Sequence, residues 1–550
     1  MHALKPIFIC MFLLITPTIL RTDYEESNWL IQYIDENPWS TYNYASNISA
    51  ISLNRSLSRY SFRAGGSIGE YQVYLYLKKL LESWSLETKV DEFNFIEWSI
   101  YDEPNITITI ENETETTRIY PVHYTFGTPD EGLIANITYL PLPSKFSYDP
   151  LPENLTLIWN TTNISNKILL IGREVLFNAD WSDKFFSKIA EERPLAVLYM
   201  WATDEFKNFP MFFSSTGGRR YPLYRVYKLP VAWIPKNLIA KILNALEQNK
   251  TVIGRIRIPI KESSGIVRNL MATLSGKDAS KMLLITAHYD SVMTPALSDN
   301  AAGVAGVLEL AWAFSRAVRE EKYVPPINIT FAFFTCEEAG LIGSAKFIEM
   351  HKKQVRDSLV GVINLDTLGS YKLQVSIARM SLRYLWREVY IHDVVTKIAK
   401  SMGVEIETFE DVIHSDDSTF SAPTSVYELI STWWPDFELN FSDVVPRPAV
   451  MVGSWPYLPW QRDSEGRVGW IHTPYDNVTS TVMYDWVDPN RLELQVKVIG
   501  LSVLEILEYY EEESSNKLIE LELLLGLSAC IIIAVIIIIM ISRREKSKLI

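Results

Sequence analysis

The sequence predicts an α/β fold in which helices pack on both faces of a β-sheet. Short, uncharged apolar runs such as 283–285 and 360–365 are typical of strands that are covered on both faces. Segments with apolar residues at helical spacing follow these runs, for example at 301–314 and 339–353. Because strands, loops and helices recur in this way along residues 259–512, we expect one large open-sheet domain there.

Histidine and carboxylate side chains follow four of the predicted strands, at 283–285, 327–336, 360–365 and 449–453. They are His288, Asp290, Asp299, Glu337, Glu338, Asp366 and His472. A single His-X-Asp after a strand is more often a surface ion pair than a binding site. In an open α/β sheet, however, ligands bind outside the carboxyl ends of the strands, so recurrence at four strand ends favours a shared binding site.

Five of these residues are suited to hold two divalent metal ions. The imidazoles of His288 and His472 and the carboxylates of Asp299, Glu338 and Asp366 suffice for two ions if one carboxylate bridges them. The set contains no thiolate, which favours zinc or a similar ion over a structural cysteine site. Two such ions would outweigh the three negative charges, and the surplus positive charge would lower the pKa of a shared water molecule.

Two further carboxylates have supporting roles in this interpretation. Neighbouring residues on an extended chain point in different directions, so Glu337 need not bind metal when Glu338 does. Glu337 can then accept a proton from the water as a general base. Asp290 comes two residues after His288 and is placed to orient that imidazole.

The rest of the chain divides where the sequence pattern changes. Residues 22–118 form the predicted N-terminal part of the main domain and include an amphipathic helix at 67–84, with Ser67 and Glu70 as its capping box. Residues 119–258 read as short strands and two helices without a cluster of potential ligands, which indicates a structural or substrate-gating insert. The main domain resumes at 259 and closes with a helix at 491–510.

Two apolar segments near the chain ends predict where the protein lies. Residues 1–21 carry Lys5 and the apolar run 7–15, a pattern typical of a secretory signal peptide or an uncleaved anchor. After a stalk at 513–522, residues 523–541 form an uncharged run of 19 residues, which suits one membrane-spanning helix. The tail 542–550 is basic, so the positive-inside rule places this tail in the cytoplasm and the catalytic domain outside it.

Composition agrees with an extracytoplasmic domain. The formal net charge of −14 argues against a nucleic-acid partner and for a soluble, acidic ectodomain. The three cysteines lie in the predicted signal, on a core strand and in the membrane segment, so no disulfide framework is expected. The ectodomain is predicted to be a glycoprotein because it carries N-glycosylation sequons. These include Asn47, Asn105, Asn112, Asn136, Asn154, Asn163 and Asn477.

Five motifs occur along the main domain in the order AHYDS, SDNAAG, CEEAGLIGS, NLDTLG and IHTPYD. As a set they resemble the two-zinc exopeptidase family, which holds bacterial secreted leucyl aminopeptidases and glutamate carboxypeptidase II. The resemblance covers roughly residues 266–507, together with the segment RYSFRAGGSIGE at 59–70. It implies a mixed, mainly parallel β-sheet between helices and two zinc ions per chain.

The resemblance also implies a role for each candidate residue. Asp299 would bridge the two ions, and in this family the following peptide bond, here Asp299–Asn300, is often cis. Glu337 would be the base. The other ligands would divide between the ions, His288 and Asp366 for one, Glu338 and His472 for the other. The insert 119–258 resembles a protease-associated domain, which is an α+β module.

Two segments depart from the family pattern. The loop SDDSTF at 415–420 resembles one that more often reads Ser-Asp-His, so Asp417 stands where a histidine is common. The Trp-rich stretch 424–470 has no simple match in short bacterial members. Its tryptophans either wall a substrate pocket or serve in packing; they are Trp433, Trp434, Trp455 and Trp460. Both departures bear on specificity more than on chemistry.

The sequence therefore predicts a membrane-anchored, extracytoplasmic zinc metallopeptidase that acts as an aminopeptidase on peptides or proteins. A glutaminyl-cyclase-like acyltransferase with one zinc is an alternative, since it shares the fold and a related His-Tyr-Asp-Ser motif. The intact SDNAAG and EEAGLIGS motifs favour the peptidase. A non-catalytic receptor-like relative is a third interpretation, but such relatives typically lose ligands. Carboxypeptidase activity, side-chain preference and oligomeric state stay open.

Overall fold

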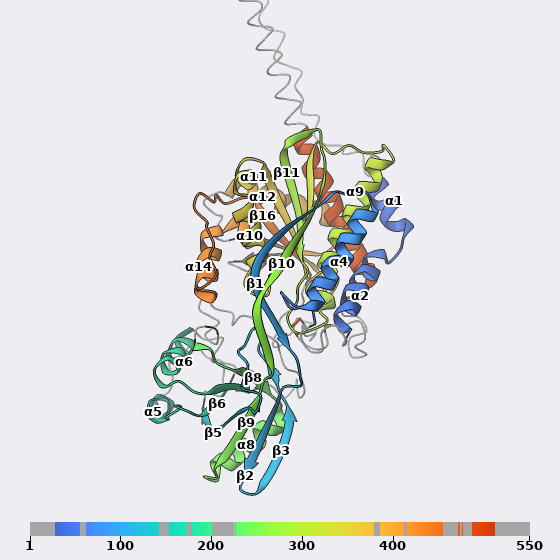
Figure 1. Ribbon diagram of the computed structural model, residues 1–550. Coiled ribbons are helices and arrows are strands. Elements are labelled where there is room, and N and C mark those ends of the chain that lie inside the picture. The colour runs from blue at the N-terminus through green and yellow to red at the C-terminus, as the bar shows by residue number, and fades with distance from the viewer. Residues whose placement is uncertain are drawn as a thin grey trace, which may run out of the picture.

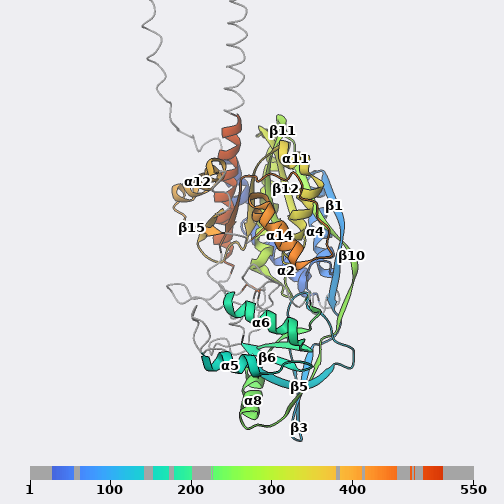
Figure 2. The same cartoon turned by 90° about the vertical axis from the view of Figure 1, so that its left-hand side faces the viewer.

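The computed structural model describes residues 28–54, 62–141, 153–172, 179–200, 225, 227–378, 385–411, 415–454, 471–472, 476 and 487–511. The described chain forms two bodies, each built on an eight-stranded sheet, and the long strands β1 and β10 run between them (Figures 1 and 2). The predicted signal peptide, stalk, membrane helix and cytoplasmic tail lie outside the described residues.

The main sheet is mixed, with the strand order β1-β10-β12-β11-β13-β16-β14-β15. Its strands are β1 (Thr88–Ile100), β10 (Ile260–Leu274), β11 (Asp278–His288), β12 (Ile327–Phe334), β13 (Leu359–Asp366), β14 (Leu373–Ala378), β15 (Ile406–Asp411) and β16 (Ala449–Gly453). Strands β12, β11, β13 and β16 are parallel to one another and occupy the centre. Antiparallel pairing adds β10 and β1 on one side and β14 on the other.

Helices cover both faces of this sheet. Leu283 and Ile285 of β11 belong to a large core cluster with α9 (Gly303–Arg319) and the helical residues 489–511. Met282 and Leu284 belong to a second cluster with α10 (Ile342–Met350) and α11 (Lys352–Asp357). Because successive residues of a strand point to opposite faces, β11 is buried on both sides. The other helices of this body are α1 (Asn28–Glu36), α2 (Ser40–Leu53), α4 (Ile68–Ser83), α12 (Leu385–Ser401), α13 (Asp417–Ser421) and α14 (Pro423–Trp433).

The predicted helix near residue 67 is α4, and its N-terminus is capped by side chains. The Ser67 hydroxyl accepts the backbone N–H of Glu70 at 3.2 Å, as the capping box predicts. The Glu70 carboxylate accepts the N–H of Gly66 at 2.9 Å, one residue before the position that a regular capping box uses.

One helical stretch among the described residues is long and apolar enough to cross a membrane by length and composition. It runs from Leu297 to Arg319 and contains α9, and 83% of its most apolar window is buried inside the protein. Since its neighbours are the core strands of the main sheet, it is the central core helix of this body.

The second body is an α+β unit with the strand order β3-β2-β9-β5-β6-β7-β8-β4. Its strands are β2 (Asn105–Ile110), β3 (Glu113–Arg118), β4 (Tyr120–Pro121), β5 (Leu133–Leu140), β6 (Ile168–Gly172), β7 (Ala196–Met200), β8 (Val231–Ile234) and β9 (Val252–Arg257). Its helices are α5 (Glu153–Thr161), α6 (Ala179–Glu192) and α8 (Lys236–Glu247). The sequence pattern places the start of this unit at residue 119. In the structure, β2 pairs with β9 along its whole length, so the sheet begins at Asn105.

The two bodies share a hydrophobic cluster. Tyr124 of the second body lies with its ring centroid 5.3 Å from that of Trp434, which follows α14 of the main body. Phe95 of β1 contacts both rings edge-on, and the Trp98 indole donates to the carbonyl of Thr125 at 3.0 Å. Trp433 and Trp434 are buried in this cluster. These two tryptophans therefore serve in packing, whereas Trp455 and Trp460 lie outside the described residues.

Candidate metal centre

Parallel pairing brings two of the predicted ligands to the same level of the sheet. In the β11–β13 pair, Thr286 is opposite Asn364, and two residues further along these strands are His288 and Asp366. The Nε2 atom of His288 lies 3.5 Å from Oδ1 of Asp366. Both side chains are buried, so the sheet itself fixes one half of the candidate centre.

Asp299 lies between the two predicted histidine ligands. It belongs to the segment Leu297–Ala302 that leads into α9, and its own backbone angles are not helical. Its peptide bond to Asn300 is cis, as the family resemblance implies. Its Oδ1 lies 3.3 Å from Nε2 of His288, and its Oδ2 lies 2.9 Å from Nε2 of His472. One carboxylate thus turns a different oxygen to each histidine.

Glu338 completes a second group of three. It follows β12, and its Oε1 lies 3.2 Å from Nε2 of His472. The potential ligand atoms of His288, Asp299 and Asp366 all lie within 4.8 Å of one another, and the same holds for Asp299, Glu338 and His472. All five predicted metal ligands are thereby brought together, and the two groups share Asp299.

The chemistry of the site fits a pair of metal ions. Two ligands about 2.1 Å from a tetrahedral zinc ion lie roughly 3.4 Å apart, and the four N···O separations above range from 2.9 to 3.5 Å. Among the described residues, three of the buried ligand atoms have no hydrogen-bond partner: Nε2 of His288, Oε1 of Glu338 and Oδ1 of Asp366. Buried polar atoms are normally paired, so these atoms indicate a position for a cation.

The electrostatic field at the site also favours positive charge. Burial alone would lower the pKa of His288, but the carboxylates of Glu337 and Asp366 raise it well above its usual value. The pKa of His472 is raised in the same way, against the effect of burial, chiefly by Glu338 and Asp299. The site thus stabilises a cation on each imidazole, and a divalent ion would meet the same need.

Glu337, the predicted base, lies beside both groups and belongs to neither. Burial raises the pKa of its carboxyl well above the usual value, and the neighbouring carboxylates of Glu338, Asp416 and Asp366 raise it further. A carboxyl with a raised pKa is a stronger base when ionised, which suits a group that takes a proton from water.

The Asp290 carboxylate lies near the imidazole of His288 and also accepts two backbone hydrogen bonds. Its Oδ1 is 3.5 Å from Nδ1 of His288, at the outer limit of a hydrogen bond. Its two oxygens accept the backbone N–H groups of Glu337 at 3.0 Å and of Glu338 at 3.3 Å. The sequence predicts the orientation of His288; the shorter contacts show that Asp290 also fixes the turn after β12.

The predicted ligand Asp366 is hydrogen-bonded by a residue that the sequence analysis did not single out. The Ser415 hydroxyl donates to Oδ2 of Asp366 at 2.7 Å and accepts from the side chain of Asn364 at 2.8 Å. The only sequence signal for Ser415 is its place at the start of the SDDSTF loop. Asp417 of this loop belongs to neither ligand group and accepts from the Ser376 hydroxyl at 3.3 Å.

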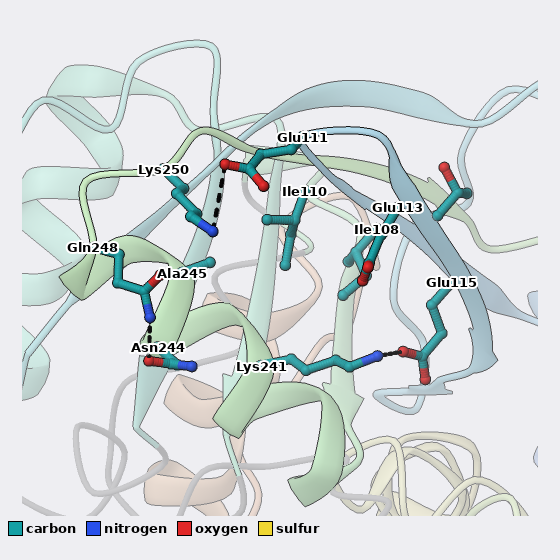
Figure 3. Close-up of a pocket in the computed structure, with 11 residues that line it drawn as sticks. Ile108, Ile110, Glu111, Glu113, Glu115, Lys241, Asn244, Ala245, Gln248 and Lys250 are labelled. Carbon is teal, nitrogen blue, oxygen red and sulfur yellow. Dashed lines mark hydrogen bonds and ion pairs between the residues drawn. The ribbon is translucent and has the colours of Figure 1, made fainter.

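The described part of the second body holds no group of metal-binding side chains. Figure 3 shows a groove of this body, about 250 Å³ in volume, between the β2–β3 hairpin and α8. Charged residues of this groove pair with each other, Lys241 with Glu115 and Lys250 with Glu111. The groove contains no histidine and lies at the far end of the molecule from the main sheet (Figure 1).

Comparison with known proteins finds similarity in the same region. Residues 269–488, which contain every predicted ligand, match Peptidase family M28. The chain is 36% identical over 103 residues to leupeptin-inactivating enzyme 1 of Streptomyces exfoliatus, covering 18% of this chain and 23% of that protein. It is 24% identical over 314 residues to the probable lipoprotein aminopeptidase LpqL of Mycobacterium tuberculosis, covering 56% of this chain and 55% of that protein. The chain thus spans about half or less of these relatives.

Solved structures show the same fold. An aminopeptidase from Aneurinibacillus sp. strain AM-1 superposes with a TM-score of 0.55 at 18% identity, over 86% of this chain and 95% of that one. A peptidase M28 precursor from Shewanella amazonensis superposes with a TM-score of 0.58 at 16% identity, over 87% and 95%. The mixed α/β fold predicted from the sequence is therefore confirmed.

Proposed function

We propose that this chain is a zinc-dependent aminopeptidase that uses two metal ions to hydrolyse peptide bonds. The observation that carries the proposal is the pair of ligand groups that share Asp299, each with one histidine and two carboxylates. The match to Peptidase family M28 and the aminopeptidase names of several relatives support it. Both groups are complete, which supports a two-zinc peptidase over a one-zinc cyclase or a receptor that has lost its ligands.

In this proposal His288 and Asp366 would hold one ion, Glu338 and His472 would hold the other, and Asp299 would be shared between them. The ions would supply a water molecule of lowered pKa and a Lewis acid for the scissile carbonyl. Glu337 would take a proton from that water at its carboxylate and return it to the nitrogen of the departing amine. Asp290 would keep Glu337 in place, because it binds the backbone N–H of that residue.

The second body would restrict which substrates reach the centre. Its residues 122–125 pack against the main body beside the candidate centre. Burial lowers the pKa of His123 to about 3, and the charge of nearby His472 adds to this effect. We propose that this inserted unit, which has the α+β composition of a protease-associated domain, gates the substrate and takes no part in chemistry.

The location of the protein is also a proposal, since the apolar runs 1–21 and 523–541 lie outside the described residues. We propose a single-pass membrane protein with its catalytic domain outside the cytoplasm. A chain that ends near residue 514 should be soluble and active. A requirement for detergent, or protection of the ectodomain from protease added outside intact cells, would contradict this topology.

The decisive experiment combines metal analysis with a panel of peptides. We expect about two zinc ions per chain, and release of the first residue from peptides with a free N-terminus but not from N-blocked ones. Release of the last residue from N-blocked peptides would indicate a carboxypeptidase. Cyclisation of an N-terminal glutamine without hydrolysis, together with one zinc ion, would indicate the acyltransferase instead.

A further inference from the structure

A buried arginine and a buried aspartate hold the loop that joins two of the proposed ligands. The loop 289–299 runs from the residue after His288 to Asp299, and every residue in it is buried. It therefore has no contact with bulk water to satisfy its backbone groups, and protein side chains must do so.

Arg63 binds this loop at both ends. Its Nε donates to the carbonyl of Tyr289 at 3.0 Å, and its Nη2 donates to the carbonyl of Ala296 at 2.7 Å. Its Nη1 donates to the carbonyl of Pro295. In return the backbone N–H of Ser291 donates to the Arg63 carbonyl at 3.2 Å. One planar guanidinium thus sets the distance between the start and the end of the loop.

Asp476 binds the remaining three residues up to the proposed bridge. Its Oδ1 accepts the backbone N–H of Ser298 at 2.7 Å, and its Oδ2 accepts that of Asp299 at 3.1 Å. Its backbone carbonyl accepts the N–H of Leu297 at 3.2 Å. Asp476 comes four residues after His472, so it joins the His472 segment to the backbone of Asp299.

The two residues also compensate each other's charge. Arg63 and Asp476 are both fully buried. The described hydrogen bonds of the guanidinium go to carbonyls and to the Ser52 hydroxyl. Burial lowers the pKa of Arg63, while the carboxylates of Asp476 and Asp299 raise it, and the resulting value is about 10. Arg63 therefore stays charged at neutral pH. A fixed positive charge therefore lies among the acidic groups of the centre.

We propose that Arg63 and Asp476 are positioning residues that fix the loop 289–299, so that Asp299 presents one oxygen to each histidine before any metal binds. The proposal rests on the two-metal site proposed above. Without ions, Asp299 lies close to the carboxylates of Glu338 and Asp366, and repulsion would favour turning it away. Holding the loop by its backbone prevents this and lowers the cost of binding the ions.

Asp476→Asn tests the proposal with little change of shape. The asparagine oxygen can accept one of the two N–H groups, while its NH₂ group faces the other donor. In zinc-free protein we expect the amide hydrogens of Ser298 and Asp299 to exchange at least about 10-fold faster. We expect one of the two zinc ions to bind about 10–100-fold more weakly in chelator competition, which is typical for residues behind a metal ligand. The kcat should fall while KM stays near the wild-type value.

Arg63→Lys is the second variant, and it keeps the charge but loses the planar fork. It should loosen the same loop, and its effect should not add to that of Asp476→Asn, since both act on one segment. Glu309→Gln is the matched control: it also changes a buried carboxylate to an amide, but Glu309 faces Ser40 and Thr41 on α2. The zinc affinity of this variant, and its amide hydrogen exchange in the loop 289–299, should match the wild type.

The result that overturns the proposal is wild-type zinc affinity and wild-type exchange of residues 297–299 in Asp476→Asn. If that variant does not fold, the same measurements on Arg63→Lys decide, and unchanged values again overturn it. Failure of the proposed function is distinguishable, because wild-type protein would then lack zinc or fail to cleave peptides. Faster exchange in zinc-free Asp476→Asn would support the positioning role even in that case.

Discussion

Asp290 accepts the backbone N–H of Glu337 at 3.0 Å, so one acidic side chain sets the place of another through its backbone. The second oxygen of Asp290 accepts the N–H of Glu338 at 3.3 Å. Asp290→Asn can keep only one of these bonds, because its NH₂ group cannot accept. We expect kcat or metal affinity to fall about 10–100-fold. Steady-state kinetics and zinc titration check this. A fully active variant would show that Asp290 has no role in the site.

Glu337→Gln separates the proposed base from the metal ligands. The amide has the shape of the carboxylate but cannot take a proton, and general base catalysis contributes about 10²–10⁴-fold. We expect kcat to fall by that order while about two zinc ions remain, because Glu337 belongs to neither ligand group. Elemental analysis and peptide hydrolysis test both parts. Loss of an ion, or full activity, would contradict the role given to Glu337.

Asp299→Ala should lose metal as well as rate. Asp299 is the member common to both ligand groups, with one oxygen toward each histidine. Its removal leaves two ligands for each ion. We expect fewer than two zinc ions per chain and little hydrolysis in the same assays that Glu337→Gln undergoes. If Asp299→Ala binds two ions as tightly as the wild type, Asp299 is not the bridge.

The second body should be removable without loss of the metal centre. Ile100 at the end of β1 pairs with Ile260 at the start of β10, so a two-residue Asn-Gly turn can join them as a hairpin. Removal exposes Phe95 and Trp434, which pack on Tyr124, so the melting temperature should fall. Zinc content should stay at the wild-type value and cleavage of larger substrates should increase. Loss of metal from folded protein would show that the second body completes the site.

Glu309 makes stability depend on pH. Burial raises the pKa of this α9 carboxyl from 4.5 to about 7. The folded state therefore holds a proton that the unfolded state has released, so this contribution is full below about 4.5 and is lost as the pH rises through about 7. The loss amounts to roughly 3 kcal/mol at most.

Glu309→Gln should remove this dependence, because the amide oxygen still accepts from Ser40 and cannot ionise. The unfolding free energy of the variant relative to the wild type should rise with pH across this window and level off above it. Urea unfolding at several pH values measures the difference. A relative stability that falls with pH would contradict the raised pKa.

The five proposed ligands could be predicted because each follows a recognisable feature of the chain. Three of them follow central strands, and parallel pairing brings strand ends to one edge of the sheet whatever the loops do. The division of residues 105–118 could not be predicted in this way. Their alternating pattern fits either sheet, and only pairing with β9, far along the chain, assigns them to the second body.

Arg63 and Asp476 were not singled out because their role depends on backbone partners. Backbone carbonyl and N–H groups are common to nearly all residue types. The sequence therefore does not show which loop an arginine side chain will bind. Asp476 had one available signal, its place in the IHTPYD motif beside His472. Trp434 is a similar case, since its packing against Tyr124 depends on a contact between the two bodies.

Residues that meet at the candidate centre lie far apart in the sequence, and this has a consequence for biosynthesis. The side-chain bonds from Arg63 to the loop 289–299 join residues 226 to 233 positions apart, and those of Asp476 reach back 177 to 178 positions. Domains fold as they emerge from the ribosome, N-terminal parts first. The ligand group that contains His472, and the bonds of Asp476 to residues 297–299, cannot form until residue 476 has emerged. A nascent or prematurely terminated chain would therefore have no peptidase activity.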